Sequence, residues 1–405
     1  MIEKVFKAYD IRGIYGPEID EDLAWAIGHA TSQFLRKQIS GYDRGQASTN
    51  RVVVGHDMRP HSDPLTAALI EGISSSGATC VDIGMCDTPM VYFAINHLGA
   101  CGGIQVTASH NPIEYNGFKI SGTIEAALDD CDLVIDASPG GQGYENKINL
   151  YIPKNIMAIY QGGETTLGDK AVSDLLFNSR ANYDLAVGKR HVMQGSCNVT
   201  GMGRILEPLR EKFGDEIIRF DVTLVRRSAD IEQTDKKVTD TIEMTEKPHH
   251  GDDVKTYFGK DAPLFVRAIK VPTRQMHLHI MDVRFKDSAP KPSDVHKIFS
   301  NEFGVAILWT AKGTKDVRDY ADTTGFNFTD TNMIHIHANM TAAIGDTLQM
   351  MYSDDQTGIV IPENHMLMQS LLFGKSYKEA FSNTESIFHM KEKKQKLEEH
   401  FAKQD

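Results

Sequence analysis

The sequence predicts a mixed fold that combines α/β and α+β parts. Two apolar runs, RVVVG (51–55) and TCVDIG (79–84), flank a segment whose apolar residues recur four apart, which indicates a strand–helix–strand unit. After residue 215 the pattern changes to long alternating runs, typical of antiparallel strands with one solvated face. From residue 363 the chain is predicted to be helical. We therefore expect an α/β first part, a second α/β part, and an α+β part inserted before C-terminal helices.

The individual elements follow from local patterns. A first helix is predicted over residues 63–78, where Leu65, Leu69 and Ile73 share one face. An amphipathic helix is predicted over residues 203–215, where Gly214 stops it. The other predicted elements are strands at 102–109, 132–138, 156–164, 216–227, 262–272 and 276–285, and helices at 123–131 and 291–304.

Size and charge restrict the class of protein. A chain of 405 residues can form two or three domains. The net charge of -12 argues against a general nucleic-acid or anionic-membrane surface. No apolar stretch is long enough to predict a membrane span. The five cysteines form no C-x-x-C pair and the N-terminus lacks the apolar core of a signal peptide, so we expect free thiols in a reducing cytoplasm.

A first group of motifs places a serine where phosphoryl chemistry is possible. TASHNP (107–112) exposes Ser109 at a strand end, and Lys119 in NGFK could neutralise a phosphate. Arg12, together with the pair Asp57 and Arg59, adds possible anion contacts. By itself TASHNP is equally well explained as a turn.

FKAYDIRG, GHDMRP, TASHNP and NGFK, in this order, resemble the first domain of the phosphomannomutase/phosphoglucomutase family of α-D-phosphohexomutases over about residues 4–121. The resemblance implies that Ser109 carries a transferable phosphoryl group and helps to bind Mg²⁺, with Arg12 and Lys119 nearby. That family also carries a D-G-D-G-D-R metal loop. Residues 122–405 contain no D-x-D-x-D, so mutase activity of this chain alone is not expected.

A second group of motifs surrounds Cys197 in SCNVTG (196–201). The predicted helix after it places the thiol near a helix N-terminus, which is expected to lower the thiol pKa, and Asn198 offers an amide donor. A nucleophilic cysteine needs a base, usually a histidine distant in sequence. The candidates are His249, His250, His277, His279, His335 and His337. The alternatives are a small buried cysteine and a histidine metal site, and the latter lacks a C-x-x-C or H-E-x-x-H partner.

Seven ordered motifs between residues 123 and 365 resemble the archaeal-type (type II) glyceraldehyde-3-phosphate dehydrogenases: DLVIDASPGGQGYENK, IYQGGE, SCNVTG, VRRSAD, HHGDDV, VPTRQMHLH and IVIPEN. The resemblance implies phosphorylating oxidation of D-glyceraldehyde 3-phosphate to 1,3-bisphosphoglycerate, with inorganic phosphate and NAD or NADP, in a homotetramer. It implies that Cys197 is the nucleophile and His277 the base. It further implies that substrate contacts Ser196, Asn198, His249 and His250, and that cofactor contacts Gly143, Arg226 and Gln356.

The two resemblances meet at residues 119–123. The dehydrogenase family begins with a strand carrying G-x-G-x-x-G, which binds a pyrophosphate at a helix N-terminus, and residues 1–122 contain no such motif. We therefore predict three domains: a mutase-like segment 1–121, a partial Rossmann-like nucleotide-binding domain 122–196 plus 335–405, and a catalytic domain 197–334 with a mainly antiparallel sheet. The expected activity is a dehydrogenase with an impaired cofactor site. The alternatives are a phosphohexomutase acting through Ser109 with Mg²⁺, and an inactive chimera.

Overall fold

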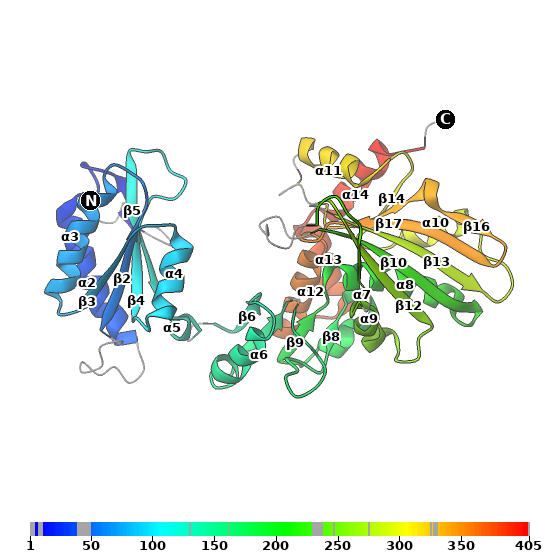
Figure 1. The fold of residues 1–405 in the computed structure, drawn as a ribbon, viewed down its shortest axis with the longest axis horizontal. Coiled ribbons are helices and arrows are strands. Elements are labelled where there is room, and N and C mark those ends of the chain that lie inside the picture. Colours follow the sequence, from blue (N-terminus) through cyan, green and yellow to red (C-terminus); the bar gives the residue numbers. More distant parts are fainter. Residues whose placement is uncertain are drawn as a thin grey trace. The chain divides into compact units, whose positions relative to one another are not determined.

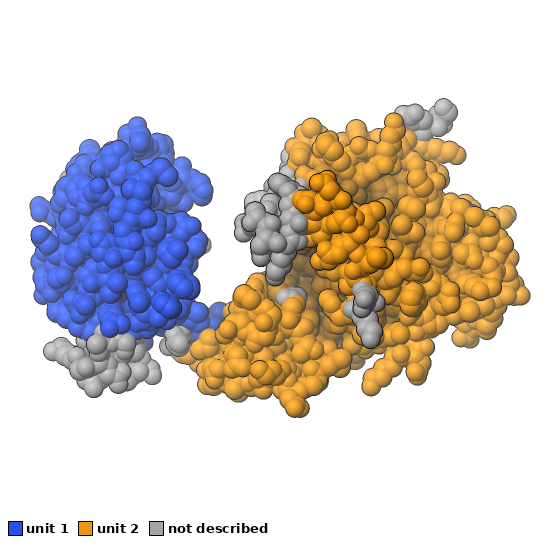
Figure 2. All heavy atoms as spheres, in the orientation of Figure 1, with its two compact units in different colours: residues 1–131 blue, residues 132–405 orange. Residues whose placement is uncertain are grey.

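The computed structural model describes two compact units, Met1–Cys131 and Asp132–Asp405 (Figure 2). The residues it describes are 5–6, 11–38, 50–128, 131–161, 163–228, 238–245, 248–273, 276–324, 326 and 331–403. The division between the units lies after residues 119–123, where the two sequence resemblances meet. The finer division into 122–196 plus 335–405 and 197–334 stays a prediction.

The first unit is a five-stranded sheet with helices on both faces (Figure 1). Its strand order is β1-β5-β4-β2-β3, and β2 runs parallel to β3 and β4 while β5 runs antiparallel to β1 and β4. The strands are β1 Ile11–Ile14, β2 Arg51–His56, β3 Thr79–Met85, β4 Gly102–Val106 and β5 Tyr115–Gly122. The helices are α2 Glu21–Gln38, α3 Ser62–Ser75, α4 Thr88–His97 and α5 Ile124–Leu128. The predicted strand–helix–strand unit is thus confirmed as β2–α3–β3.

Two glycines explain how closely α2 and α3 pack on one face of this sheet. A Cβ on Gly28 would lie 2.3 Å from the Leu69 carbonyl oxygen, and one on Gly72 would lie 2.0 Å from the Trp25 carbonyl oxygen. Only glycine therefore allows the two backbones to meet at these points.

The second unit contains a four-stranded parallel sheet in the order β6-β7-β9-β8. Its strands are β6 Leu133–Asp136, β7 Met157–Tyr160, β8 Leu176–Phe177 and β9 His191–Gln194. Between them lie α6 Gln142–Asn146 with a π-helical turn Lys147–Tyr151, and α7 Ser179–Asn182 with a 3-10 turn Tyr183–Ala186. The C-terminal helices are α12 Val360–Phe373, α13 Tyr377–Ile387 and α14 Met390–His400. Side chains of α12 share one core with the sheet, which confirms the predicted helical C-terminus.

A mixed sheet forms the rest of the second unit, in the order β11-β12-β10-β13-β17-β15-β14, with β16 paired to β17. The strands are β10 Ile217–Arg227, β11 Glu243–Thr245, β12 Leu264–Val271, β13 His277–Phe285, β14 Val305–Leu308, β15 Ile334–His337, β16 Ala342–Ile344 and β17 Thr347–Asp354. The helices are α8 Cys197–Phe213, α9 His250–Phe258, α10 Pro292–Ser300 and α11 Thr314–Thr323.

The expectation that β10 and β12 are antiparallel is wrong, because the two strands pair in parallel. Parallel neighbours need a crossover connection, and α9 supplies it between them. The β10–β13 and β13–β17 pairs are antiparallel as predicted. The fold therefore combines α/β and α+β parts, as the sequence predicts. Among the described residues, no helix has the length and apolarity needed to cross a membrane.

Helix α8 begins at Cys197, six residues before the predicted start at residue 203. Its first turns contain two glycines, which weaken a helix and led to the prediction of a turn. In the structure these two glycines allow neighbouring side chains to approach α8 closely. A Cβ on Gly201 would lie 2.7 Å from Asp354 Oδ2, and one on Gly203 would lie 2.4 Å from Asn178 Nδ2. Residues 198–209 are all buried, so tertiary contacts override the weak local propensity.

Candidate active site

Cys197 lies at the point where the parallel sheet of the second unit meets the mixed sheet. Strand β9 ends at Gln194, and Cys197 is the first residue of α8. Its Sγ is 3.3 Å from Nε2 of His277, the first residue of β13. The structure therefore brings the predicted nucleophile and the predicted base into contact.

Asn198 is the second polar partner of the thiol. Its Nδ2 donates toward Cys197 Sγ at 3.6 Å, and its Oδ1 accepts from His279 Nε2 at 3.0 Å. His277 and His279 both face α8, because alternate residues of β13 share one face. The amide thus links the second histidine of the H-x-H pair to the sulfur.

Burial determines the charge state of the resting pair. Burial, together with the nearby Asp354 carboxyl, raises the pKa of Cys197 to about 12, although Arg227 and Arg226 act in the opposite direction. The expectation of a lowered thiol pKa is therefore wrong, because desolvation at the buried start of α8 outweighs the helix dipole. Burial, with His279 and Arg227, lowers the pKa of His277 well below its usual range. The resting pair is a neutral thiol and a neutral imidazole.

Two contacts hold the His277 segment in place. Gln356 Oε1 accepts a hydrogen bond from the Met276 backbone N–H at 2.8 Å. The Arg227 backbone N–H donates a long hydrogen bond of 3.4 Å to His277 Nδ1, which favours the resting tautomer with the proton on Nε2. Gln356 was predicted to contact cofactor, and in the structure its oxygen fixes the backbone before the base.

The other predicted substrate residues differ in exposure. His250 is buried at the start of α9, and burial, His249 and Arg226 lower its pKa to about 2. His249 stacks on it with ring centroids 4.2 Å apart, is mostly exposed, and lies 3.7 Å from the Asp253 carboxylate. Ser196 Oγ is buried and has no hydrogen-bond partner among the described residues. Ser196 and His250 thus supply uncharged polar atoms, and Arg226 supplies positive charge near the thiol.

Gly143 is engaged within the protein. Glu164 Oε1 accepts from the backbone N–H groups of Gly141 and Gly143 at 2.8 and 2.9 Å. A Cβ on Gly143 would lie 2.9 Å from the same oxygen. A carboxylate of the chain thus holds the N–H groups that an anionic cofactor would need at this turn.

NAD or NADP fits this unit only in part. The carboxyl end of a parallel sheet is where dinucleotides bind, and β9 leads from that edge directly to Ser196 and Cys197. Cys197 therefore follows the sheet edge at which a dinucleotide would bind. The pyrophosphate has less support, because Glu164 holds the glycine N–H groups at residues 141 and 143.

Ser109 lies in the first unit, in a loop that Arg59 organises. The Arg59 guanidinium donates to the carbonyl oxygens of Ser109, Asn111, Pro112 and Tyr115 at 3.0, 2.8, 2.7 and 3.1 Å, and its Nε lies 3.1 Å from Asp57 Oδ2. Asp57 and Arg59 were predicted to contact an anion, but these bonds make them supports of the loop.

Ser109 itself adopts φ 55°, a backbone conformation that is unusual for a residue other than glycine. It lines a cavity of about 590 Å³ together with Thr107. Arg12 and Lys119 lie on β1 and β5 and are not among its lining residues.

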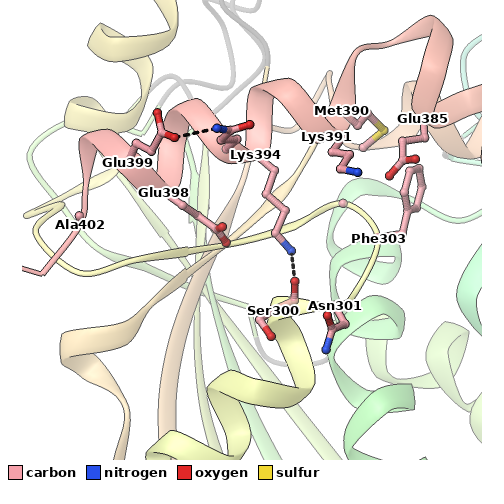
Figure 3. A pocket seen from close by; sticks show the side chains of 12 residues that line it. Ser300, Asn301, Phe303, Glu385, Met390, Lys391, Lys394, Glu398, Glu399 and Ala402 are labelled. Atoms are coloured by element: carbon pink, nitrogen blue, oxygen red, sulfur yellow. Dashed lines mark hydrogen bonds between the residues drawn. The ribbon is translucent and has the colours of Figure 1, made fainter.

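A further cavity of about 620 Å³ lies between α14 and the loop that follows α10 (Figure 3). Lys394 Nζ crosses it to donate to the Ser300 carbonyl oxygen at 2.7 Å. It shares no residue with the thiol site. Among the described residues, no cluster of three or more His, Cys, Asp or Glu could hold a metal ion.

Sequence reasoning did not single out Arg227 or Asp354, and it weighed His279 only as a possible base. Asp354 lies opposite His277 in the β13–β17 ladder, and its buried carboxyl has no hydrogen-bond partner among the described residues. The alternation of M-H-x-H correctly predicted that His277 and His279 share a face. No local pattern reveals Asp354, because its position depends on the register between two distant strands.

Comparison with known proteins agrees with both resemblances. Residues 3–131 match the family profile described as phosphoglucomutase/phosphomannomutase, alpha/beta/alpha domain I. A glyceraldehyde-3-phosphate dehydrogenase from Halobacterium salinarum is 37% identical over 215 residues, which are 52% of this chain and 62% of that protein. The one from Thermoplasma volcanium is 34% identical over 263 residues, 61% of this chain and 72% of that protein. The one from Pyrobaculum arsenaticum is 31% identical over 283 residues, 68% of this chain and 79% of that protein.

The chain thus spans about three fifths of the length of the Halobacterium salinarum dehydrogenase and nearly four fifths of the Pyrobaculum arsenaticum one. Over the larger part of the molecule, the matched length, the identity and the Cys197–His277 pair agree with the dehydrogenases. Residues 3–131 instead match the phosphohexomutase domain. The chain belongs to the glyceraldehyde-3-phosphate dehydrogenase family.

Proposed function

We propose that this protein oxidises D-glyceraldehyde 3-phosphate to 1,3-bisphosphoglycerate with inorganic phosphate and NAD or NADP. The observation that carries the proposal is the 3.3 Å contact between Cys197 Sγ and His277 Nε2. A cysteine paired with a histidine is the arrangement that nucleophilic thiol catalysis requires. The relatives named glyceraldehyde-3-phosphate dehydrogenase, at 31–37% identity, support the same reaction.

The first step is attack of Cys197 Sγ on the aldehyde carbon. The thiol is neutral at rest, so the ring proton of His277 first moves to Nδ1, and Nε2 then takes the thiol proton as the sulfur–carbon bond forms. The aldehyde oxygen gains negative charge, which the Asn198 amide N–H beside the sulfur is placed to stabilise. The imidazolium then returns its proton to that oxygen and a thiohemiacetal results.

Oxidation of the thiohemiacetal leaves a thioester on Cys197. His277 accepts the hydroxyl proton, and NAD or NADP, when bound, would supply the oxidant for the hydride lost from the same carbon. A phosphate oxygen then attacks the thioester carbon, the sulfur leaves, and the sulfur recovers a proton from His277. Proton transfer through a placed histidine contributes roughly 10²- to 10⁴-fold to such steps.

Ser196, His249 and His250 are the candidate partners of the substrate phosphate. Arg226, near the thiol, is a candidate contact of the cofactor. Because Glu164 holds the N–H groups of Gly141 and Gly143, we propose that cofactor binds weakly. We further propose a homotetramer, as the family resemblance implies, and a cytoplasmic location, with which five free cysteines agree.

These observations favour the dehydrogenase over the phosphohexomutase alternative. Arg59, which was expected to contact phosphate near Ser109, is engaged by four carbonyl oxygens and Asp57. Residues 122–405 contain no D-x-D-x-D for Mg²⁺. The inactive-chimera alternative is also disfavoured, because the thiol, the base and the amide donor are assembled within one compact unit.

Turnover tests the proposal. We expect D-glyceraldehyde 3-phosphate, phosphate and either NAD or NADP to yield reduced nicotinamide, with a high KM for cofactor. Omission of phosphate should stop steady turnover, because the thioester then persists. Absence of turnover at saturating cofactor, with the chain folded, would contradict the proposed reaction.

A further inference from the structure

A buried histidine that the reaction does not use directly lies beneath the nucleophile. We propose that His279 is a positioning residue, which holds the Asn198 amide so that its N–H group faces the Cys197 sulfur. The inference deepens the proposed function, since it concerns the same thiol, but its test needs neither cofactor nor aldehyde.

The hydrogen bonds fix the direction of the amide. His279 Nε2 lies 3.0 Å from Asn198 Oδ1. An amide oxygen can only accept, so Nε2 is the donor. With Oδ1 engaged in this way, Nδ2 is left to face Cys197 Sγ at 3.6 Å.

A flipped amide would present its oxygen to the sulfur. That oxygen would repel a thiolate and the developing oxyanion, and Nδ2 would meet the Nε2–H of His279, donor against donor. The flip could be accommodated only by moving the ring proton to Nδ1, which has no partner among the described residues. A buried N–H group without a partner is rarer and more costly than an unused lone pair.

The ring of His279 is itself held rigidly. It packs edge-on against Tyr352, with ring centroids 4.5 Å apart, and it is fully buried. On its other side α8 approaches so closely that a Cβ on Gly201 would lie 3.3 Å from His279 Cε1. The donor therefore has a fixed location relative to the helix that carries Cys197 and Asn198.

His279 also stays uncharged. Burial lowers its pKa to about 3, so the ring remains a neutral donor throughout the working range of pH. The groups whose charges act on Cys197 are Asp354 on β17 and Arg226 and Arg227 on β10, and His277 on β13 is its hydrogen-bond partner.

The test is the pH dependence of Cys197 alkylation by iodoacetamide, with the modified peptide quantified by mass spectrometry. We expect His279→Leu to raise the apparent thiol pKa by about one unit, which is about tenfold in reactivity below that pKa. His279→Gln keeps an N–H donor for Asn198 Oδ1, so its profile should stay close to that of the native chain. In an Asn198→Ala background, His279→Leu should add no further shift.

Two results would overturn the inference. One is an equal shift for His279→Leu and His279→Gln, and the other is a full additional shift in the Asn198→Ala background. If His279→Leu does not fold, the other two variants test the inference. His279→Gln should then show a near-native profile, and Asn198→Ala should show a raised thiol pKa. Equal shifts in these two variants would overturn the inference. A chain that shows these profiles but no turnover would refute the proposed reaction and leave this inference standing.

Discussion

Replacement of Cys197 by serine is expected to lower kcat/KM by about 10⁴-fold or more, the usual effect of removing a catalytic nucleophile. A serine hydroxyl has a far higher pKa than a thiol, and His277 is buried and hard to protonate, so proton transfer cannot compensate. The side chains have similar volumes, and Cys197 is only partly buried. The thermal midpoint of the variant should therefore remain near that of the native chain.

Cys101 provides the matched control for this substitution. It is a buried cysteine of the first unit whose Sγ donates to the Arg51 carbonyl oxygen, whereas the thiol site belongs to the second unit. Cys101→Ser should leave kcat/KM unchanged. Retention of more than a tenth of native activity by Cys197→Ser would show that another group attacks the aldehyde.

Glu363→Ala is expected to lower the free energy of unfolding of the second unit by about 3–5 kcal/mol, because it leaves a buried guanidinium without its counter-ion. Glu363 Oε1 accepts from Arg204 Nε and Nη2 at 2.9 and 2.6 Å, and the two side chains are 0% and 2% exposed. The same carboxylate accepts from the Ser179 backbone N–H and hydroxyl at 2.6 and 2.7 Å. It thus joins α12 to α7 and to α8, the helix that begins at Cys197.

Denaturant unfolding followed by tryptophan fluorescence measures this loss. The chain has two tryptophans, one in each unit, so Trp25→Phe leaves Trp309 as a reporter of the second unit. Asp319→Ala is the control, because its ion pair with Lys315 is largely exposed and should contribute less than about 1 kcal/mol. A loss for Glu363→Ala no larger than that of the control would contradict the role given to the buried pair.

Only about half of the strands were predicted from sequence, since β1, β5, β8, β9, β11, β14, β16 and β17 were missed, and most strand partners were not predicted. The continuous apolar run of β2 and the alternating run of β13 are local signals, so both strands were located correctly. The parallel pairing of β10 with β12 depends on where α9 crosses, which the alternating pattern does not encode. The start of α8 was missed because Gly201 and Gly203 look like a turn until the close contacts of the helix are known.

The site was predictable as a set of residues, and its electrostatics were not. The motifs identified Cys197, His277 and Asn198, and the structure brings them together. The helix dipole is a local feature, whereas the burial that raises the thiol pKa comes from strands far away in sequence. The contact of Asp354 with this site likewise depends on the register of β13 against β17.

The direct test of Cys197 as the nucleophile is to look for an acyl group on its sulfur. The native chain is mixed with D-glyceraldehyde 3-phosphate and NAD or NADP without phosphate, quenched in acid, and digested for mass spectrometry. We predict a 3-phosphoglyceroyl thioester on the Cys197 peptide, formed together with an equal amount of reduced nicotinamide and lost when phosphate is added before the quench. Reduced nicotinamide without a thioester on Cys197, or a thioester on another cysteine, would contradict the account.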